Sequence, residues 1–293
     1  MEHSMLKTLL TFLLLNWASL IFSQTKLLIG MDDLSETTYT ELKNKNIETL
    51  KVIYGVDIYP KDPLKADLEV MKAAIVKAFP DKNEYGYGML DWEGKAYHIL
   101  AHSRTETKAF KDIRAEFIRA ISFAKKLRPN VKWGFFEIPF RDVRFSNKET
   151  KLKSHSKILE LLRECDVLYP SMYGYTPNYI GSLNDVSYAI SLASELNKEV
   201  FPMVWHRYQG DNNTKEKRYW FEVIPKNLFV NRIRDIRKVK YNGKQVDGIV
   251  WWGKDTYFYE KKNRVVRMEA QNINDFKTIY NNLVKEYAIE IVK

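Results

Sequence analysis

The sequence contains a single cysteine, Cys165, among 293 residues. No disulfide can form within the chain, so packing alone must hold the fold together. Cys165 ends the segment LLREC at 161–165, and no histidine and acid near it form a nucleophilic arrangement, which favours a buried core thiol over a catalytic one. The five histidines are scattered without the paired spacing of a zinc site. The sequence therefore predicts neither a bound metal nor another cofactor.

Two further patterns are missing from the chain. It has no glycine-rich phosphate-binding fingerprint of the kind that opens a dinucleotide-binding domain. It also has no low-complexity segment and no stretch rich in proline, glycine and serine that would mark a linker. Everything after the first residues is therefore predicted to form one domain, residues 24–293.

Long apolar runs are scarce, and the one near the amino terminus is short. Lys7 precedes the apolar stretch 9–22, which is shorter than the ~20 residues that a membrane-spanning helix needs. A lone positive charge, an apolar stretch and small residues near a plausible cut predict a secretory signal over residues 1–23, cleaved after Ser23 or Gln24, with a membrane anchor as the alternative. We expect a secreted or periplasmic protein with no stable membrane insertion after removal of the signal.

Acidic residues are fewer than basic residues. The chain has 47 lysine and arginine residues against 37 aspartate and glutamate residues, for a net charge of +10. Such a balance favours an acidic partner, whether nucleic acid, an anionic surface or an acidic polysaccharide. An exported protein rarely meets nucleic acid, so an anionic polysaccharide is the predicted partner. The basic segment 232–238 is more typical of a solvated helix face than of a binding patch. The oligomeric state is left open by these patterns.

Apolar strand-like runs alternate along the chain with stretches that have the apolar spacing of helices. The predicted strands are residues 26–30, 50–55, 85–93, 131–136, 166–173, 200–205 and 246–252, and the predicted helices lie within 63–78, 107–127, 148–163, 186–196, 215–239 and 272–287. Strict alternation indicates a parallel sheet. So many units in one domain favour an α/β fold of the closed kind, a distorted (β/α) TIM-like barrel of seven or eight strands, over an open sheet.

Two carboxylates end the third predicted strand, in the tripeptide Asp91-Trp92-Glu93. Residues i and i+2 of a strand point to the same side, with alpha carbons ~7 Å apart, so the tryptophan should face away from the acids. Like charges this close cannot both ionise cheaply, and one carboxyl tends to keep its proton near neutral pH. A protonated acid beside a charged carboxylate can break a glycosidic bond. Asp91 and Glu93 are therefore the candidate catalytic residues.

The other predicted strands also end in aromatic and polar residues, at the barrel edge where active sites lie. These strand ends contain Tyr54, Asp57, Glu137, Tyr173, Arg207, Tyr208 and Trp252. Aromatic faces stack on sugar rings, and phenol hydroxyls supply hydrogen bonds. For any single residue, capping of the barrel core is an equally good interpretation. Together they favour a cleft for a sugar polymer, and we treat them as candidate substrate-binding residues.

Five segments follow one another in a specific order. They are GMLDWE at 88–93, LRP at 127–129 with WGFF at 133–136 and Pro139, LYPSMY at 168–173, PMVWHRY at 202–208, and GIVWW at 248–252. In order and spacing these segments resemble the hyaluronidases, glycoside hydrolase family 56, over roughly residues 85–260. Each segment alone is a weak signal, and the five in sequence are a fairly specific one. The animal enzymes of that family carry disulfides, and some carry a cysteine-rich module. Their absence here favours a bacterial member.

The resemblance implies a mechanism. In that family one glutamic acid protonates the leaving oxygen and later activates water, and the carbonyl oxygen of the substrate's own N-acetyl group is the nucleophile. Carried over to this sequence, Glu93 is the general acid/base and Asp91 shares its proton. Tyr208 would orient the acetamido group, Tyr173 would support the same subsite, and Trp252 would form the wall behind the reactive sugar.

Two departures from the family accompany this likeness. Glu137 stands where the family usually has a small or aromatic residue, and it is predicted to be one of two things, a surface carboxylate or a polar contact in the cleft. The segment 205–207 is also unusual for the family. The predicted function is hydrolysis, with retention, of N-acetylhexosaminidic linkages in an anionic polysaccharide of hyaluronan or chondroitin type. The alternatives are a chitinase-like hydrolase, whose longer acidic signature is absent before Leu90, and a non-catalytic polysaccharide-binding protein.

Overall fold

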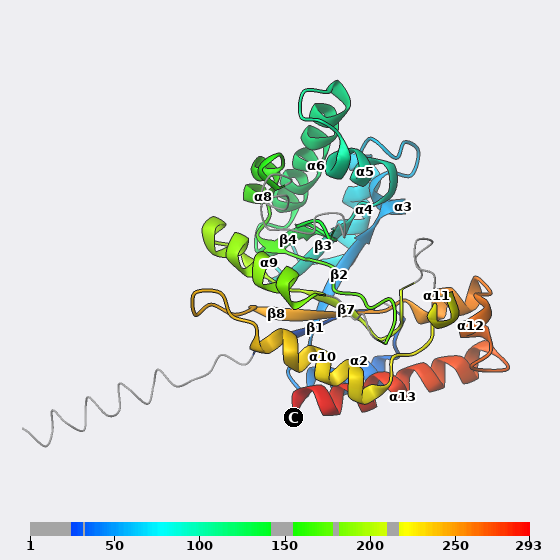
Figure 1. The fold of residues 1–293 in the computed structure, drawn as a ribbon. Coiled ribbons are helices and arrows are strands. Elements are labelled where there is room, and N and C mark those ends of the chain that lie inside the picture. Colours follow the sequence, from blue (N-terminus) through cyan, green and yellow to red (C-terminus); the bar gives the residue numbers. More distant parts are fainter. Residues whose placement is uncertain (1–24, 32, 142–154, 178–181, 210–216) are drawn as a thin grey trace, which may run out of the picture.

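The computed structural model describes residues 25–31, 33–141, 155–177, 182–209 and 217–293 (Figure 1). The signal predicted for residues 1–23 lies outside these ranges and stays a prediction. Within the described ranges, no helix combines the length and apolar character needed to cross a membrane.

Parallel strands form the centre of the molecule, in the order β4-β3-β2-β1-β8-β7, and a separate pair joins β5 to β6. Their bounds are β1 Lys26–Gly30, β2 Glu48–Tyr54, β3 Gly86–Asp91, β4 Val131–Phe135, β5 Val167–Leu168, β6 Glu199–Val200, β7 Met203–Trp205 and β8 Gly248–Trp252. Every strand pair is parallel, as the alternation of strands and helices predicts.

The gap between the two sheets is bridged, so the barrel closes. Glu137 N donates to Tyr169 O at 3.0 Å, which links the end of β4 to the strand that begins with β5. Ser171 pairs in parallel with Met203, which links that strand to β7. Strands β6 and β7 are two pieces of one run, separated where Pro202 has no N–H to donate. The labelled strands thus occupy seven positions around the barrel, and the predicted TIM-like barrel is confirmed.

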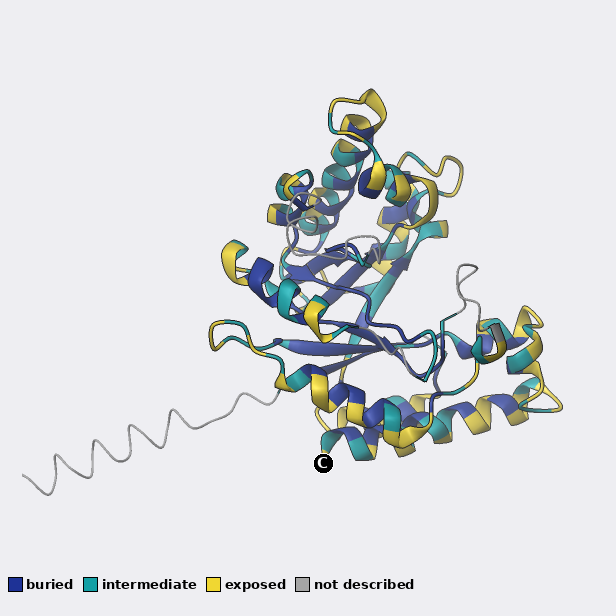
Figure 2. Cartoon of the chain, in the orientation of Figure 1, coloured by how far each residue is buried: buried dark blue, intermediate teal, exposed yellow. Residues whose placement is uncertain are grey.

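The barrel encloses its own apolar interior, distinct from the core between barrel and helices. Alternate residues of β2 divide between them: Leu50 and Val52 belong to the interior cluster, whereas Ile53 belongs to the outer core. Tyr87, Met89, Tyr169, Phe201 and Met203 fill the same interior. Figure 2 shows the strands as the most buried part of the chain, with exposed residues on the outer faces of the helices and in the connecting loops. This packing keeps the interior solid beneath the carboxyl ends of the strands.

Helices cover the outside of the barrel. They are α2 Glu36–Lys43, α3 Gly55–Ile58, α4 Leu68–Ala78, α5 Gly94–His102, α6 Lys108–Leu127, α8 Leu159–Glu164, α9 Leu183–Leu196, α10 Lys226–Lys238, α11 Asp255–Glu260, α12 Arg264–Arg267 and α13 Ile273–Val292, with a 3-10 turn at Lys217–Tyr219. In Figure 1, α4, α5 and α6 gather on one side, and α2, α10 and α13 on the opposite side. Thr107 caps α6, and its Oγ1 accepts a hydrogen bond from Phe110 N at 3.2 Å.

One predicted helix begins later than its start signal indicates. The segment predicted from residue 63 becomes helical at Leu68, where Asp67 is the N-cap and its Oδ1 accepts from Val70 N at 3.3 Å. Asp62 instead closes a turn, accepting from Leu64 N at 2.9 Å. An aspartate before proline suits both arrangements, so this local signal did not decide between them. Of the helix predicted at 148–163, residues 148–154 lie outside the described ranges.

Candidate active site

Strand β3 places the two candidate catalytic carboxyls. Asp91 is its last residue, and Glu93 follows as the residue before α5. Both side chains line one cavity at the carboxyl end of the barrel. Trp92 points the other way, as predicted, and is 1% exposed. Its indole stacks on Phe117 with ring centroids 4.6 Å apart, and its Nε1 donates to Pro63 O at 3.1 Å. The buried tryptophan therefore anchors the tripeptide and fixes the direction of both acids.

The surroundings favour protonation of this pair. Burial raises the pKa of Asp91 well above its usual range, and the charge of Glu93 raises it further. Burial also raises the pKa of Glu93, by a smaller amount. Glu93 is the more exposed of the two side chains. Two carboxyls that interact in this way titrate as a unit. The pair therefore favours a proton on one of its carboxyls, and Glu93 is the one nearer to solvent.

The cavity has a volume of about 220 Å³ and mostly aromatic walls. It is lined by Met89, Asp91, Glu93, Phe136, Tyr173, Trp205, Gln209, Phe221, Trp252 and Phe258. Tyr173 stacks on Trp252 with ring centroids 5.6 Å apart, and Trp205 meets Trp252 edge-on at 5.3 Å. Burial raises the pKa of Tyr173 well above its usual range, and the nearby carboxylates add to the shift, so its phenol stays protonated. Aromatic walls with a few polar groups suit a sugar ring.

Two polar atoms of the lining residues are buried without a hydrogen-bond partner in the described part of the chain. They are the indole Nε1 of Trp205 and the amide Oε1 of Gln209. The first can only donate a hydrogen bond, whereas the side-chain amide of Gln209 can donate and accept. A buried polar group without a partner costs free energy that a bound ligand can recover. The cavity therefore offers recognition for a ligand that carries both an acceptor and a donor.

Tyr54 and Glu137 also lie near the carboxyl pair. Tyr54 is paired in register with Asp91 across β2 and β3, so the two side chains point the same way. Glu137 follows β4 in a left-handed conformation with φ 57°, and its charge raises the pKa of Asp91. A non-glycine residue in this region is uncommon, and such strain gathers at functional sites. The charge of Glu137 acts on Asp91 but its side chain is not among the lining residues, so both alternatives for Glu137 stay predictions.

Arg207 and Tyr208 are not brought to this cavity. The guanidinium of Arg207 is buried in a network behind it, where Nε donates to Asp255 Oδ2 at 2.6 Å and the two terminal nitrogens donate to Glu269 at 2.6 and 2.8 Å. Tyr208 is 2% exposed and packs in the outer core, against Tyr219. Strand β7 ends at Trp205, and the regular alternation that would set the direction of these side chains ends there as well.

One predicted residue, Asp57, lies away from the cavity, and several lining residues were not indicated by the sequence. Asp57 lies in the short helix α3 and is not among the lining residues. Trp205 stood in a predicted strand end without a role assigned to it, and the alternation along β7 points it inward. Phe221 and Phe258 reach the cavity from a turn and from α11. No pattern in their own sequence segments indicates this, because their direction depends on long-range packing.

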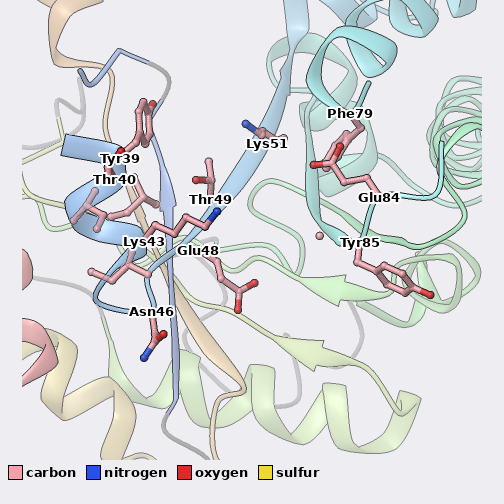
Figure 3. A pocket seen from close by; sticks show the side chains of 14 residues that line it. Tyr39, Thr40, Lys43, Asn46, Glu48, Thr49, Lys51, Phe79, Glu84 and Tyr85 are labelled. Atoms are coloured by element: carbon pink, nitrogen blue, oxygen red, sulfur yellow. The ribbon is translucent and has the colours of Figure 1, made fainter. Parts of the chain in front are cut away.

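A larger hollow of about 700 Å³ lies elsewhere, over the outer surface of β2. Figure 3 shows Tyr39, Lys43 and Asn46 on one side of it, Phe79, Glu84 and Tyr85 on the other, and Glu48, Thr49 and Lys51 between them. Neither Asp91 nor Glu93 is part of it. The candidate carboxyl pair therefore lies in the smaller aromatic cavity and not in the larger hollow.

Sequence comparison finds curated relatives but no family model that matches. The chain is 22% identical over 270 residues to the hyaluronidase of Apis mellifera, a match covering 70% of this chain and 66% of that protein. It is 25% identical over 253 residues to the protein of Tabanus yao named Hyaluronidase Tab y 2.0101, with 72% and 68% covered. The match therefore spans about two thirds of the length of each relative.

Solved structures extend the likeness to nearly the whole chain. Bee venom hyaluronidase superposes with a TM-score of 0.59 at 15% identity, covering 90% of this chain and 99% of that one. The same enzyme in complex with a hyaluronic acid tetramer gives 0.59 at 16% identity, with 89% and 98% covered. At these identities the superposition shows a shared barrel fold.

Proposed function

The chain is a homologue of the hyaluronidases, which are glycoside hydrolases, and on that premise we propose that it hydrolyses N-acetylhexosaminidic linkages in an anionic polysaccharide of hyaluronan or chondroitin type. The observation that carries the proposal is the carboxyl pair Asp91 and Glu93, with both pKa values raised, on the wall of an aromatic cavity. The excess of positive charge, +10, favours an anionic polymer over a neutral one.

The proposed reaction proceeds in two steps with retention of configuration. In the first, the carboxyl proton of Glu93 passes to the glycosidic oxygen as the bond from that oxygen to C1 breaks. The carbonyl oxygen of the substrate's N-acetyl group forms a new bond to C1, giving a cyclic oxazolinium ion. In the second step, Glu93 takes a proton from water as the water oxygen attacks C1 and opens the ring. Glu93 ends the cycle protonated, as it began.

Asp91 would hold the proton of the pair and then the negative charge. Burial and the charge of Glu93 both favour a proton on Asp91. Transfer of that proton to Glu93 leaves a buried carboxylate at Asp91, beside the cationic ring that forms in the first step. A fixed negative charge in a dry site stabilises such a cation more than water does.

The acetamido group would be oriented by residues other than Tyr208. The buried indole N–H of Trp205 supplies a donor for the acetamido carbonyl, and the amide of Gln209 supplies an acceptor for its N–H. The protonated phenol of Tyr173 lies against the same wall, and Trp252 stacks behind it. This assignment keeps the predicted roles of Tyr173 and Trp252 and replaces that of Tyr208.

The decisive experiment is to incubate the purified protein with hyaluronan, chondroitin and chitin fragments and to measure the length of the products. We expect shortened, saturated chains from the anionic polymers, and loss of nearly all hydrolysis in Glu93→Gln with its folding unchanged. Full activity in Glu93→Gln would contradict the assignment. Cleavage of chitin alone would favour a chitinase-like enzyme, binding without shortening would favour a non-catalytic binding protein, and unsaturated products would indicate a lyase.

Export is part of the same proposal. A polymeric, extracellular substrate requires the enzyme outside the cytoplasm, and the segment 1–23 has the charge and apolar pattern of a secretory signal. Amino-terminal sequencing of the protein recovered from the medium or periplasm of its host should begin near residue 24. A product that retains residues 1–23 in the membrane fraction would favour the anchor instead.

A further inference from the structure

A lysine stands beside the carboxyl pair and has no role in the reaction as described above. Lys254 follows strand β8 by two residues and precedes α11. Its Nζ lies 3.3 Å from the centroid of the Tyr54 ring. Because Tyr54 is paired in register with Asp91, their side chains leave neighbouring strands on the same side. The ammonium group thus lies over the ring of a residue that neighbours Asp91 across the sheet, and its charge acts on the Asp91 carboxyl.

The backbone around Lys254 is fixed by its neighbours. A Cβ at Gly253 would lie 2.9 Å from the His206 ring and 3.0 Å from the Tyr280 hydroxyl, so that position is tightly packed. Asp255 is fully buried and accepts from Arg207 at 2.6 Å. The chain is thus held on both sides of Lys254, and the flexible stem is directed over the Tyr54 ring. A cation over an aromatic face gains further attraction when partly desolvated.

The charges around Asp91 are unequal. Acidic groups reach it from β3 and from the end of β4, whereas Lys254 supplies a positive charge from the end of β8. The titratable groups from the elements that surround Asp91 are Tyr54, Tyr59, Glu93, Glu137, Tyr173 and Lys254. The charges of Glu93 and Glu137 raise the pKa of Asp91, whereas the charge of Lys254 lowers it. Without the lysine, nothing among those named groups would favour ionisation of Asp91.

We propose that Lys254 is a positioning residue for the catalytic carboxyls, whose ammonium group is the counter-ion that keeps one negative charge on the pair Asp91 and Glu93. The inference rests on the proposed function and deepens it. With one proton and one charge, the pair has both the acid for the leaving oxygen and the carboxylate for the cationic intermediate. With two protons it lacks the carboxylate, and the second of these roles is lost.

The direction of the pH effect follows from this charge balance. Removing the positive charge of Lys254 raises the pKa of Asp91, so the pair takes up its second proton at a higher pH. The acidic limb of the pH profile of kcat/KM, which reports the free enzyme, should move to higher pH by about one unit in Lys254→Met. Lys254→Arg restores the charge and should restore the position of the limb. KM at the new optimum should stay within about twofold, because the lysine acts on the pair and not on the polymer.

The matched control is Lys261→Met, which removes an equal charge from the far end of α11. Lys261 is exposed, and its Nζ lies 5.7 Å from the ring centroid of Tyr257. It should leave the pH profile unmoved. An unmoved limb together with a KM that rises for hyaluronan but not for neutral oligosaccharides would overturn the proposal, because the lysine would then bind a carboxylate of the substrate.

A second readout does not depend on activity. The carboxyl carbons of Asp91 and Glu93, labelled with carbon-13, report their protonation directly by NMR. Their titration midpoints should move to higher pH in Lys254→Met and return in Lys254→Arg, even in a protein that hydrolyses none of the polymers. Midpoints that do not move would overturn the counter-ion role, whereas moved midpoints without hydrolysis would contradict only the proposed function.

Discussion

Two aspartates near the carboxyl ends of strands, the half-buried Asp91 and the fully buried Asp255, have opposite electrostatics. Asp91 ends β3 and meets a second carboxyl, and burial together with that charge raises its pKa. Asp255 follows β8, and although burial alone would raise its pKa, His206 and Arg207 outweigh burial and lower it to about 2. Both acids are held in place by the fold. Only Asp91 lies in surroundings that disfavour its ionised form.

The partners of Asp255 explain the difference. Trp251 Nε1 can only donate, so His206 Nδ1 accepts from it at 3.0 Å and His206 Nε2 donates to Asp255 at 2.9 Å. Arg207 completes the set and is itself bound in bidentate fashion by Glu269. A buried charge with oppositely charged partners helps to hold the fold together. Two carboxyls that lie close together have the shifted pKa values that are typical of functional sites. We therefore assign structure to the Asp255 region and chemistry to the Asp91 region.

The largest effect should come from breaking the paired region. Arg207→Met leaves Asp255 buried without its main cation, and removal of one partner of a buried ion pair costs about 3–5 kcal/mol. The free energy of unfolding, measured in urea at pH 7, should fall by that amount. Arg234→Met on the exposed side of α10 is the control and should change it by no more than about 0.5 kcal/mol. A small decrease in the free energy of unfolding of Arg207→Met would contradict a structural role for the network.

The converse change in the reactive region should affect rate and spare stability. Asp91→Asn keeps the shape of the side chain and removes a charge that burial and Glu93 already disfavour. We expect kcat to fall by about 100-fold or more, with a free energy of unfolding at pH 7 equal to or above that of the wild type. A loss of stability as large as that of Arg207→Met would mean that Asp91 is also a structural residue.

The elements of this comparison were not equally predictable from sequence. The strand pattern decides the direction of Asp91 and Glu93, because alternation over β3 puts both on one side and Trp92 on the other. The closure of the barrel also followed from the repeated strand and helix units. Arg207 is a predicted substrate contact that does not line this cavity and is held instead by Asp255 and Glu269. It lies beyond the end of β7, where no period fixes the direction of a side chain, and a lone basic residue near aromatics is equally compatible with a ligand contact.

Long-range packing accounts for the rest. Asp255 and Glu269 come from α11 and the segment after α12, and nothing in their local sequence indicates that they bind Arg207. Gln209 reaches the cavity one residue after Tyr208 packs away from it. Lys254 was visible at a strand end, but its place over Tyr54 depends on the register between β2, β1 and β8. Sequence periodicity does not carry such information.

The pH dependence of stability should separate the two regions. The folded pKa of Asp255 is below its unfolded value, so its contribution of about 2 kcal/mol is present above pH ~4 and lost as the pH falls toward 2. The folded pKa values of Asp91 and Glu93 are raised, so their contribution is present below pH ~4 and lost as the pH rises through those values. Urea midpoints between pH 2.5 and 8 should therefore show the wild type losing stability relative to the double variant Asp91→Asn, Glu93→Gln as the pH rises from 4. A constant difference would contradict the raised pKa values.

The smallest effect tests whether the two regions are separate. Glu269 is the more exposed end of the network, with a side chain 25% exposed. Glu269→Gln keeps hydrogen-bonding atoms but removes the negative charge that Glu269 places beside Arg207. Asp255 still pairs with the guanidinium, so unfolding should become easier by only about 1 kcal/mol. The network touches the cavity wall through Arg207, whose Nη1 donates to Phe221 O at 2.7 Å, but none of its charged side chains lines the cavity. We therefore expect kcat and its pH profile to stay unchanged. A shifted pH profile in Glu269→Gln would show that charge in the paired region acts on Asp91 and Glu93, and the division between a structural and a reactive aspartate would then fail.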